Sequence, residues 1–281
     1  MSRQAIWQKI ATERAWQCIA DNVVAAVVAL RIAHPRMGAR KIYEKWSACP
    51  ENEHLVVGIG RDKFEQILMT NGLKISKLRA GHRTTYSGLC RFPNLIAGQV
   101  YTDINSVWMS DITYYWIESE WVYITLILDV YSRFCLAAVL SRTLKTEETT
   151  LPALKMALKS RGQLKYATLI FHSDGGGQYY DKNFVKLLRE HNIKSSMGLS
   201  CYENPFSERL NATVKNEYLI PKKPITFLAL AKELLQTQSL YNTDRPHQAL
   251  NYLTPVAYED FITTLAQQQR TPLKIVVVEP K

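Results

Sequence analysis

The clearest structural signal in the chain is the stretch Val107-Trp-Met-Ser-Asp111-Ile-Thr-Tyr-Tyr-Trp116. This stretch and the two that follow it are rich in Val, Ile, Leu, Tyr and Trp, and short polar turns at 118–120 and 132–133 separate them. Because such residues favour strands, the sequence predicts a three-stranded antiparallel meander over 107–116, 121–131 and 134–140. Asp111 lies inside the first strand, where a buried carboxylate is costly unless it is paired or holds a metal.

Helical and strand patterns alternate after the meander. We expect helices over 144–160 and 182–191, and strands over 167–172 and 193–197. A further helix is expected to begin at Asn204-Pro205, where a side-chain acceptor precedes a proline, and another covers 227–240. This order predicts an α/β fold with a mixed five-stranded sheet and flanking helices, in which the first and fourth strands lie side by side.

The first hundred residues are strongly basic. They carry 15 Lys and Arg against 7 Asp and Glu, whereas residues 101–281 carry 20 against 18. This asymmetry indicates a polyanion-binding N-terminal part attached to a nearly neutral body, and a solvated basic face is the alternative.

The basic part has a helical pattern. Apolar residues recur at helical spacing over 16–32, a second helix is expected over 39–46, and a third begins at Arg61-Asp-Lys63 and stops at Asn71-Gly72. Two short helices joined through glycines are typical of a helix-turn-helix reader, whose second helix enters a major groove. The predicted DNA contacts are the basic residues at the start of this helix and after it, namely Arg61, Lys63, Lys74, Lys77 and Arg79.

Composition excludes several other classes of protein. With 281 residues, 47% of them hydrophobic and 21% charged, the chain is an ordinary globular protein. Its five scattered cysteines never form Cys-x-x-Cys, which argues against a disulfide framework and a zinc knuckle. The longest apolar run, Val23–Leu30, predicts no membrane span, and no secretory signal is visible, so we expect a cytoplasmic protein.

Three acidic residues form the candidate active site. Asp111 lies in the first strand, Asp174 ends the fourth strand before Gly175-Gly-Gly177, and Glu208 projects from the first turns of the helix after Asn204. Carboxylates suit hard divalent cations such as Mg²⁺. Two such ions about 3.5–4 Å apart would stabilise both the attacking and the leaving oxygen of a phosphodiester exchange.

Other residues near this set leave alternatives open. Glu203 and Glu217 are rival third acids. His172 either orients an acid or a water, or is a structural histidine at a strand end. For Asp129, a structural salt bridge or a turn cap is the better interpretation.

Four motifs together resemble a known family. They are Trp108-Met-Ser-Asp111-Ile-Thr-Tyr114, His172-Ser-Asp174-Gly-Gly-Gly-Gln178-Tyr179, Glu203-Asn204-Pro-Phe-Ser-Glu208-Arg209 and Tyr241-Asn-x-x-Arg245-Pro-His247-x-x-Leu250. Their order and spacing resemble those of insertion-sequence transposases of the IS-three group, and Gly38-Ala-Arg-Lys-Ile and Asn71-Gly-Leu look like that family's N-terminal helical module.

The resemblance implies a fold and an activity. The core would be ribonuclease-H-like, as in retroviral integrases, and Asp111, Asp174 and Glu208 would be the metal ligands of a DNA strand-transferase. Such an enzyme nicks a transposon end with water and then attacks another phosphodiester with the freed 3′-hydroxyl, using Mg²⁺ or Mn²⁺, with two ions in each active site. The groove would be lined by Gln178, Tyr179, Asn204, Arg209 and Lys215. Arg245 and His247 would either touch DNA or buttress the core.

The resemblance also implies domains and partners. We expect a helical DNA-binding domain at 1–80, a basic linker at 81–105, the catalytic core at 106–260 and a tail at 261–281. The implied partners are double-stranded DNA with terminal inverted repeats, target DNA, further copies of the chain, and an upstream-frame helix-turn-helix protein or fusion. Only 33 residues separate Asp174 from Glu208, fewer than in the family pattern, and the shortening falls in the loop before the helix. The alternatives are a DNA-binding regulator with an inactive core and a simple nuclease of the same fold.

Overall fold

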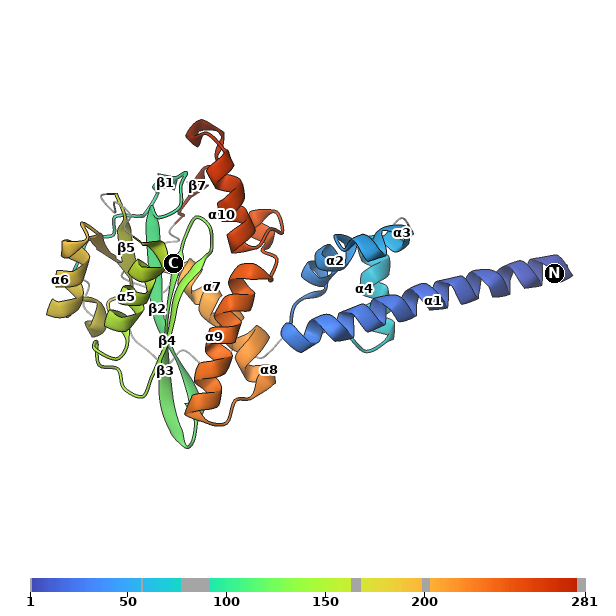
Figure 1. The fold of residues 1–281 in the computed structure, drawn as a ribbon, viewed down its shortest axis with the longest axis horizontal. Coiled ribbons are helices and arrows are strands. Elements are labelled where there is room, and N and C mark those ends of the chain that lie inside the picture. The colour runs from blue at the N-terminus through green and yellow to red at the C-terminus, as the bar shows by residue number, and fades with distance from the viewer. Residues whose placement is uncertain (1, 57, 77–90, 163–167, 199–202, 277–281) are drawn as a thin grey trace, which may run out of the picture. The chain divides into compact units, whose positions relative to one another are not determined.

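The structure, a computed structural model, describes residues 2–56, 58–76, 91–162, 168–198 and 203–276. The chain divides into two compact units, whose helices and strands are labelled in Figure 1. One unit comprises residues 1–79 together with 246–252, and the other comprises 80–245 and 253–281.

The first unit is helical. It contains α1 (Arg3–Ala33), α2 (Ala39–Ser47), η1 (Pro50–Asn52), α3 (Glu53–Val56) and α4 (Arg61–Thr70). Val23 and Val27 of α1 share an apolar core with Trp46 of α2 and Phe64 of α4, and none of the four side chains is more than 1% exposed. The three helices predicted here are therefore confirmed, whereas the short helical turns between α2 and α4 were not foreseen.

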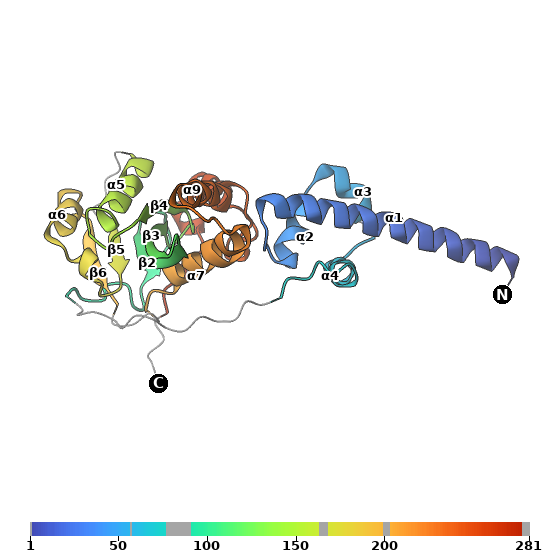
Figure 2. The ribbon, with the colours of Figure 1, turned by 90° about the horizontal axis from the view of Figure 1, so that it is seen from below.

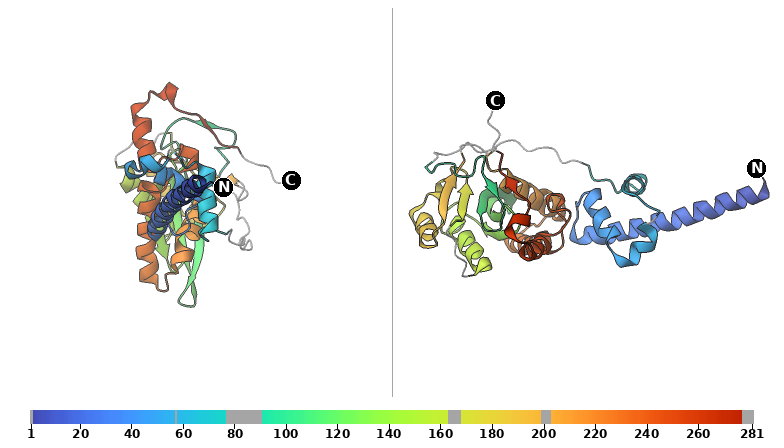
Figure 3. Two further views of the ribbon diagram at one scale, coloured as in Figure 1. Left: turned by 90° about the vertical axis from the view of Figure 1, so that its right-hand side faces the viewer. Right: turned by 90° about the horizontal axis from the view of Figure 1, so that it is seen from above.

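Helix α1 is longer than its apolar stripe predicted. The Ser2 hydroxyl accepts a hydrogen bond from the Ala5 amide and caps the helix, so that α1 runs for 31 residues. Its N-terminal half extends past the other helices of the unit (Figure 3). By length and composition alone α1 is apolar enough to cross a membrane, so the absence of a span, expected from the run Val23–Leu30, stays a prediction. Its inner face nevertheless packs Ala20, Val23 and Val27 against the helical core.

The second unit is built on a mixed five-stranded sheet. Its strands are β2 (Val107–Ile117), β3 (Glu120–Asp129), β4 (Cys135–Ser141), β5 (Ile170–Ser173) and β6 (Lys194–Met197), in the order β4-β3-β2-β5-β6. The first three form the predicted antiparallel meander, and β5 pairs in parallel with β2 and with β6. This order and these directions are those of a ribonuclease-H-like fold, and the expected adjacency of the first and fourth predicted strands is confirmed.

Helices cover both faces of the sheet, as Figure 2 shows. One face packs against α5 (Thr150–Arg161) and α6 (Lys182–Glu190). The other packs against α7 (Pro205–Thr213), the π-helical η4 (Val214–Leu219) and α9 (Phe227–Thr243). The remaining described elements of this unit are η2 (Gly177–Tyr179), α8 (Ile220–Lys222), α10 (Pro255–Thr264) and η6 (Gln267–Gln269), whereas η5 (Gln248–Leu250) belongs to the first unit. With both faces covered, Trp108 and Met109 of β2 are each fully buried on opposite sides.

Helix α5 begins later than the sequence predicted. The helix expected from residue 144 starts at Thr150, and turns cover most of the intervening residues. The Thr149 hydroxyl donates to the Lys145 carbonyl within these turns. This side chain satisfies a backbone acceptor outside the helix, which is the local competition that threonine offers to helical structure.

The segment before the sheet and the C-terminal tail pair with each other. Strand β1 (Val100–Tyr101) runs antiparallel to β7 (Leu273–Lys274), and Ile96 and Ile275 on either side are buried in the same core. Residues 91–105, which the sequence assigned to a linker, therefore pack on the core. Strands β1 and β7 form a two-stranded sheet that is separate from the five-stranded one. Of the cysteines, the described Cys18, Cys49 and Cys135 are free thiols.

Candidate active site

Asp111 is held in the middle of β2 by two hydrogen bonds. Its Oδ1 accepts from the Ile112 amide at 2.9 Å, and its Oδ2 accepts from the Asn211 Nδ2 at 2.7 Å. Strand β5 pairs only with residues 107–109 of β2, so the sheet opens beside Asp111. The carboxylate therefore lies at the point where the neighbouring parallel strand ends.

Asp174 follows the last residue of β5, in a tight glycine turn. Its Oδ1 accepts from the Gly176 amide at 3.1 Å. A Cβ on Gly176 would stand 3.1 Å from this same oxygen and 3.1 Å from the Gln178 Oε1, closer than most side chains tolerate. Glycine at this position therefore lets the turn close around the carboxylate, as the sequence predicted.

Glu208 lies in the first turn of α7 and is exposed. The helix start is fixed to β2 by Asn204, whose Nδ2 donates to the Ser110 carbonyl at 2.9 Å. The Asn204 carbonyl in turn accepts from the Glu208 amide at 3.2 Å. Asn204 occupies the N-cap position as predicted, but its side chain makes no cap hydrogen bond to the helix backbone, because its Oδ1 accepts from the Ser207 hydroxyl at 2.7 Å and its Nδ2 donates to the strand.

Electrostatics tie the three carboxylates together. Burial, followed by the charge of Asp174 and then that of Glu208, raises the pKa of Asp111 to about 7. Burial also raises the pKa of Asp174. Asp111 therefore experiences both of the other predicted acids as neighbouring charges. Within the described ranges, however, no three His, Cys, Asp or Glu side chains are gathered closely enough to hold a metal ion as they stand.

Both rival third acids have other partners. The Glu203 Oε2 accepts from the Asn94 Nδ2 at 2.6 Å. Glu217 is bound in a bidentate ion pair by Arg245, with both N···O distances 2.8 Å. These contacts leave Glu208 as the helix acid that the structure couples to Asp111.

Asp129 and His172, for which the sequence left a structural and a functional role open, both make structural contacts. The Asp129 carboxylate accepts from the backbone amides of Asn105, Tyr131 and Ser132 and lies 3.9 Å from Arg161. This is the turn cap and salt bridge favoured by the sequence. His172 is fully buried, its Nδ1 is 2.9 Å from the Ser196 Oγ, and burial lowers its pKa to about 4. It is therefore neutral near pH 7, which favours the structural interpretation.

Several predicted groove residues make internal contacts. The Tyr179 hydroxyl is buried 2.9 Å from the Ser110 Oγ, and the Gln178 Nε2 donates to the Leu144 carbonyl. The Lys215 Nζ donates to the Tyr114 carbonyl at 2.9 Å along the open edge of β2, and burial lowers its pKa. Arg209 is exposed, whereas Arg245 and His247 are buried. DNA contact by these residues stays a prediction, and for Arg245 the observed ion pair favours the buttressing alternative.

Asn211 is the site residue that sequence reasoning left without a role. It lies three residues after Glu208, on the same side of the helix, and only 7% of it is exposed. Its Oδ1 is also buried, without a hydrogen-bond partner among the described residues. The available signal was its spacing from Glu208, but spacing alone does not reveal that its amide reaches Asp111.

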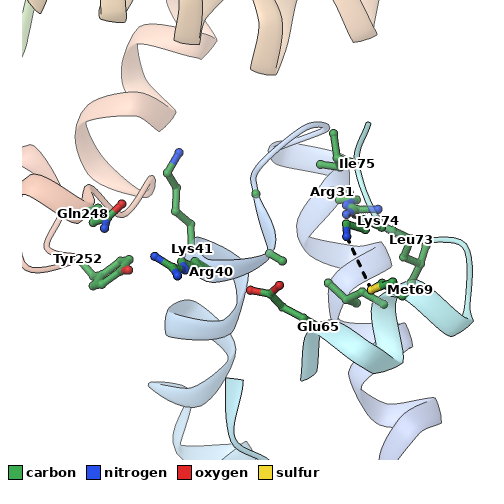
Figure 4. A pocket seen from close by; sticks show the side chains of 13 residues that line it. Arg31, Arg40, Lys41, Glu65, Met69, Leu73, Lys74, Ile75, Gln248 and Tyr252 are labelled. Atoms are coloured by element: carbon green, nitrogen blue, oxygen red, sulfur yellow. Dashed lines mark hydrogen bonds between the residues drawn. The ribbon is translucent and has the colours of Figure 1, made fainter. Parts of the chain in front are cut away.

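The basic residues predicted to contact DNA lie around α4. Arg61 and Lys63 are exposed in its first turn, and the Lys63 Nζ lies 5.9 Å from the ring centroid of Trp16. Lys74 lines a pocket with Arg31, Glu65 and Met69, and its Nζ is 3.7 Å from the Met69 Sδ (Figure 4). Lys77 and Arg79 lie outside the described residues.

Comparisons with known proteins agree with this architecture. The integrase core domain matches residues 102–200, and a second model of the same description matches 190–255. An uncharacterized 31 kDa protein of insertion element IS600 from Shigella sonnei is 30% identical over 240 residues, which cover 82% of this chain and 85% of that protein. The transposase InsF of insertion sequence IS3A from Escherichia coli strain K12 is 26% identical over 260 residues, which cover 90% of this chain and 86% of InsF.

Solved structures with a similar fold include two viral integrases. The HTLV-2 integrase catalytic core domain in complex with magnesium has a TM-score of 0.44 at 19% identity, covering 56% of this chain and 97% of that chain. The intasome of simian T-cell lymphotropic virus has a TM-score of 0.48 at 14% identity, covering 78% of this chain and 73% of that chain. From the matches to the integrase core and to the insertion-element proteins, the chain belongs to the IS3-family transposases and carries an integrase-like core.

Proposed function

We propose that the chain is a DNA strand-transferase that nicks transposon ends and joins the freed 3′-hydroxyl to target DNA. The observation that carries this proposal is that three elements of an integrase-like core each bring one carboxylate, Asp111 in the middle of β2, Asp174 directly after β5 and Glu208 in the first turn of α7. Three carboxylates that lie close together repel one another, so gathering them from separate elements costs free energy. Such a cost is expected where a function needs the three groups together. Such clusters occur at functional sites more often than in structural cores.

The donor set suits a divalent metal. Asp111, Asp174 and Glu208 offer only oxygen ligands, and the charges that raise the pKa of Asp111 are those that a cation would offset. We infer that these three residues would hold Mg²⁺ or Mn²⁺. Two such ions, when bound, would supply charge stabilisation to the attacking and the leaving oxygen of the phosphodiester.

The chain's own groups would orient the reactants. Asn211 fixes the Asp111 carboxylate, and the Gly176 amide holds the Asp174 carboxylate in the glycine turn. The exposed Arg209 lies next to Glu208 on α7 and would hold a phosphate of the DNA strand. These groups would position the phosphodiester for attack. Holding the reacting atoms in the right geometry lowers the activation barrier.

The proposed partners follow from the same assignment. They are the terminal inverted repeats of a transposon, a target duplex, and further copies of the chain assembled on that DNA. An upstream-frame helix-turn-helix protein or fusion and a location in the cytoplasm, at the nucleoid, belong to the same proposal.

The proposal is tested with purified protein, labelled transposon-end duplex and Mg²⁺ or Mn²⁺. A strand-transferase produces both a nicked end and a joined product. A DNA-binding regulator with an inactive core binds the ends and produces neither, and a simple nuclease cuts without joining. Either of the last two results, in both metals, would reject the proposal.

Removing the Asn211 amide is expected to reduce strand cutting by about 10- to 100-fold, since residues that orient a metal ligand usually have effects of this size. The change is Asn211→Leu, which keeps the branched shape of the side chain and deletes the donor to Asp111. Cutting rates at saturating DNA provide the measurement. Thr213→Val is the matched control, because Thr213 is also buried on α7 and its hydroxyl donates only to the Arg209 carbonyl. Equal rates for Asn211→Leu and wild type would show that Asp111 needs no such support.

Neutralising the start of α4 is expected to weaken DNA binding. In the double variant Arg61→Gln/Lys63→Gln, the loss of two phosphate-contacting charges lowers the slope of log affinity against log salt by about 2. Filter binding or anisotropy between low and physiological salt measures the slope. Lys182→Gln/Lys186→Gln removes the same charge from α6 of the other unit and serves as the control. An unchanged slope for the α4 variant would place the DNA-binding surface elsewhere.

A further inference from the structure

Residues 92–97 enter the core unit beside the end of β6. The Leu95 amide donates to the Ser196 Oγ at 2.9 Å, and the Met197 amide donates to the Pro93 carbonyl at 3.4 Å. Ile96 is fully buried in the core. This segment is therefore an ordered part of the core, and it lies next to the strand that leads toward α7.

Asn94 is the polar residue in the middle of this segment. Its hydrogen bonds fix which way its side-chain amide points. Its Oδ1 accepts from the backbone amides of Ile96 and Ala97, at 3.1 and 3.2 Å. Because the oxygen is occupied by two donors, the Nδ2 must face the other way. There it donates to the Glu203 Oε2 at 2.6 Å.

Glu203 is confined on its other side by Gly198. A Cβ on Gly198 would stand only 2.7 Å from the Glu203 Cβ and 3.3 Å from its Oε2, so glycine is needed for this approach. The Gly198 amide donates to the Ser173 carbonyl at 3.0 Å, directly before Asp174. Glu203 therefore lies between Asn94 and the backbone that is bonded to the end of β5.

The residue after Glu203 begins the helix that carries the third acid. Asn204 is bonded to the Ser110 carbonyl through its side chain, and its own carbonyl accepts from the Glu208 amide. A displacement of Glu203 would be transmitted through a single peptide unit to this helix start. The first turn of α7 is thus held at two adjacent residues, one against β2 and one against Asn94.

We propose that Asn94 and Glu203 form a latch that positions the first turn of α7, and with it Glu208, relative to Asp111 and Asp174. Glu203 acts in this latch as a hydrogen-bond acceptor and does not bind the metal. The inference rests on the proposed function and adds to it two positioning residues, one of which is the rival acid of the sequence analysis. Since the latch needs an acceptor and no charge at Glu203, it makes a prediction that a metal ligand at this position would not share.

Three variants of the full chain test the latch: Asn94→Ala, Glu203→Ala and Glu203→Gln. The first two remove the hydrogen bond and are expected to lower kcat for end cutting by about tenfold, with KM for the end duplex within about twofold of wild type. The double variant Asn94→Ala/Glu203→Ala should be no slower than the slower single variant, because both lose the contact between the two side chains and only Asn94→Ala also loses the bonds from the Ile96 and Ala97 amides. Glu203→Gln keeps an acceptor oxygen and is expected to retain activity within about twofold.

Hydrogen exchange gives a readout that does not depend on catalysis. The Glu208 amide, which is bonded to the Asn204 carbonyl, and the amides that follow it in α7 should exchange about tenfold faster in Asn94→Ala than in wild type, while those of α6 remain unchanged. Asn183→Ala, which alters an exposed amide on α6, is the matched control and should change neither measurement. Thermal unfolding identifies any variant whose loss of activity reflects global instability. For such a variant, hydrogen exchange in α7 compared with α6 decides whether the latch positions the helix start.

The outcomes separate the two levels of the proposal. If Glu203→Gln is as inactive as Glu208→Gln, Glu203 is a metal ligand and the latch is wrong. If Asn94→Ala matches wild type in both kcat and exchange, the contact positions nothing. If wild type itself neither cuts nor joins, the proposed function fails, while the exchange result still reports on the latch.

Discussion

Asp111→Asn is expected to abolish end cutting and joining while making the metal-free protein more stable. Activity should fall on the order of 10³-fold or more, because the loss of a ligand that holds the catalytic charge removes several kcal/mol of transition-state stabilisation, and about 1.4 kcal/mol corresponds to tenfold in rate. The opposite signs of the two effects distinguish a functional carboxylate from a structural one. A structural carboxylate would stabilise the fold, and its removal would be costly.

The gain in stability follows from the pKa of Asp111. The folded protein raises this pKa from 3.8 to about 7, so it binds the proton more tightly than the unfolded chain does. Stability is then greatest below the unfolded pKa and is lost as the pH rises toward about 7. Between pH 5 and pH 8 the metal-free wild type should lose about 3 kcal/mol from this group, and the asparagine variant should lack this component.

The site can accept the amide without adding to the number of unsatisfied groups. Asp111 receives a hydrogen bond from the Ile112 amide and another from Asn211, whose Oδ1 is buried without a partner among the described residues. An asparagine oxygen would keep the first bond. If the Asn211 amide rotates by half a turn, its oxygen accepts from the introduced NH₂ group. The Asn211 NH₂ group then takes the place of the oxygen that has no partner in wild type, so one buried group stays unsatisfied in either protein.

Urea unfolding with EDTA at pH 5 and pH 8 measures this effect, and end cutting is assayed in parallel. Asp174→Asn and Glu208→Gln should also be inactive, but Glu208 is exposed, so its variant should change stability little. Added Mg²⁺ or Mn²⁺ should raise the stability of wild type at pH 8 and leave Asp111→Asn nearly unchanged. A destabilised Asp111→Asn, or retention of metal-dependent cutting in any of the three variants, would contradict the assignment.

The order of strands was predictable from the sequence because each strand has its own local signal. The β-branched and aromatic runs at 107–117 and 120–129 flank a polar turn, and the parallel pairing of β2 with β5 follows from the helix between the strands. The start of α5 was not predictable in the same way. The turns before Thr150 depend on the Thr149 hydroxyl and on contacts such as that of the Gln178 amide with the Leu144 carbonyl, which join residues far apart in the chain.

The acids of the site were identifiable because a carboxylate in an apolar strand, or after a strand and before glycines, conflicts with its surroundings. The groups around them were not. Tyr179 and Asn204 lie in motifs that suggest surface contacts, yet both are buried, and both bind Ser110, one at its hydroxyl and one at its carbonyl. These contacts with Ser110 form because β5 ends beside β2 and leaves backbone groups of β2 without a strand partner. A local sequence pattern cannot reveal which groups these are.

The Arg245–Glu217 pair is expected to contribute strongly to the stability of the core unit. Arg245 is only 5% exposed and binds both oxygens of Glu217, while its guanidinium lies 5.6 Å from the ring centroid of Tyr241. Arg245→Leu removes one member of this buried pair and leaves the Glu217 carboxylate without the bidentate donor. The expected loss in the free energy of unfolding is about 3–5 kcal/mol, since an uncompensated buried charge is costly.

Comparison of three variants by urea unfolding separates the pair from the alternative of a DNA contact. Arg245→Lys keeps the charge but loses the bidentate geometry and should lie between wild type and Arg245→Leu. The double variant Arg245→Leu/Glu217→Leu removes both charges and should recover much of the loss, because apolar groups can replace a buried pair. An Arg245 that instead binds DNA phosphate would give the reverse pattern: stability would change by less than about 1 kcal/mol, as for an exposed cation, and the salt dependence of end binding would fall. The burial of Arg245, the partial burial of Glu217 and the two 2.8 Å contacts make the first result the expected one.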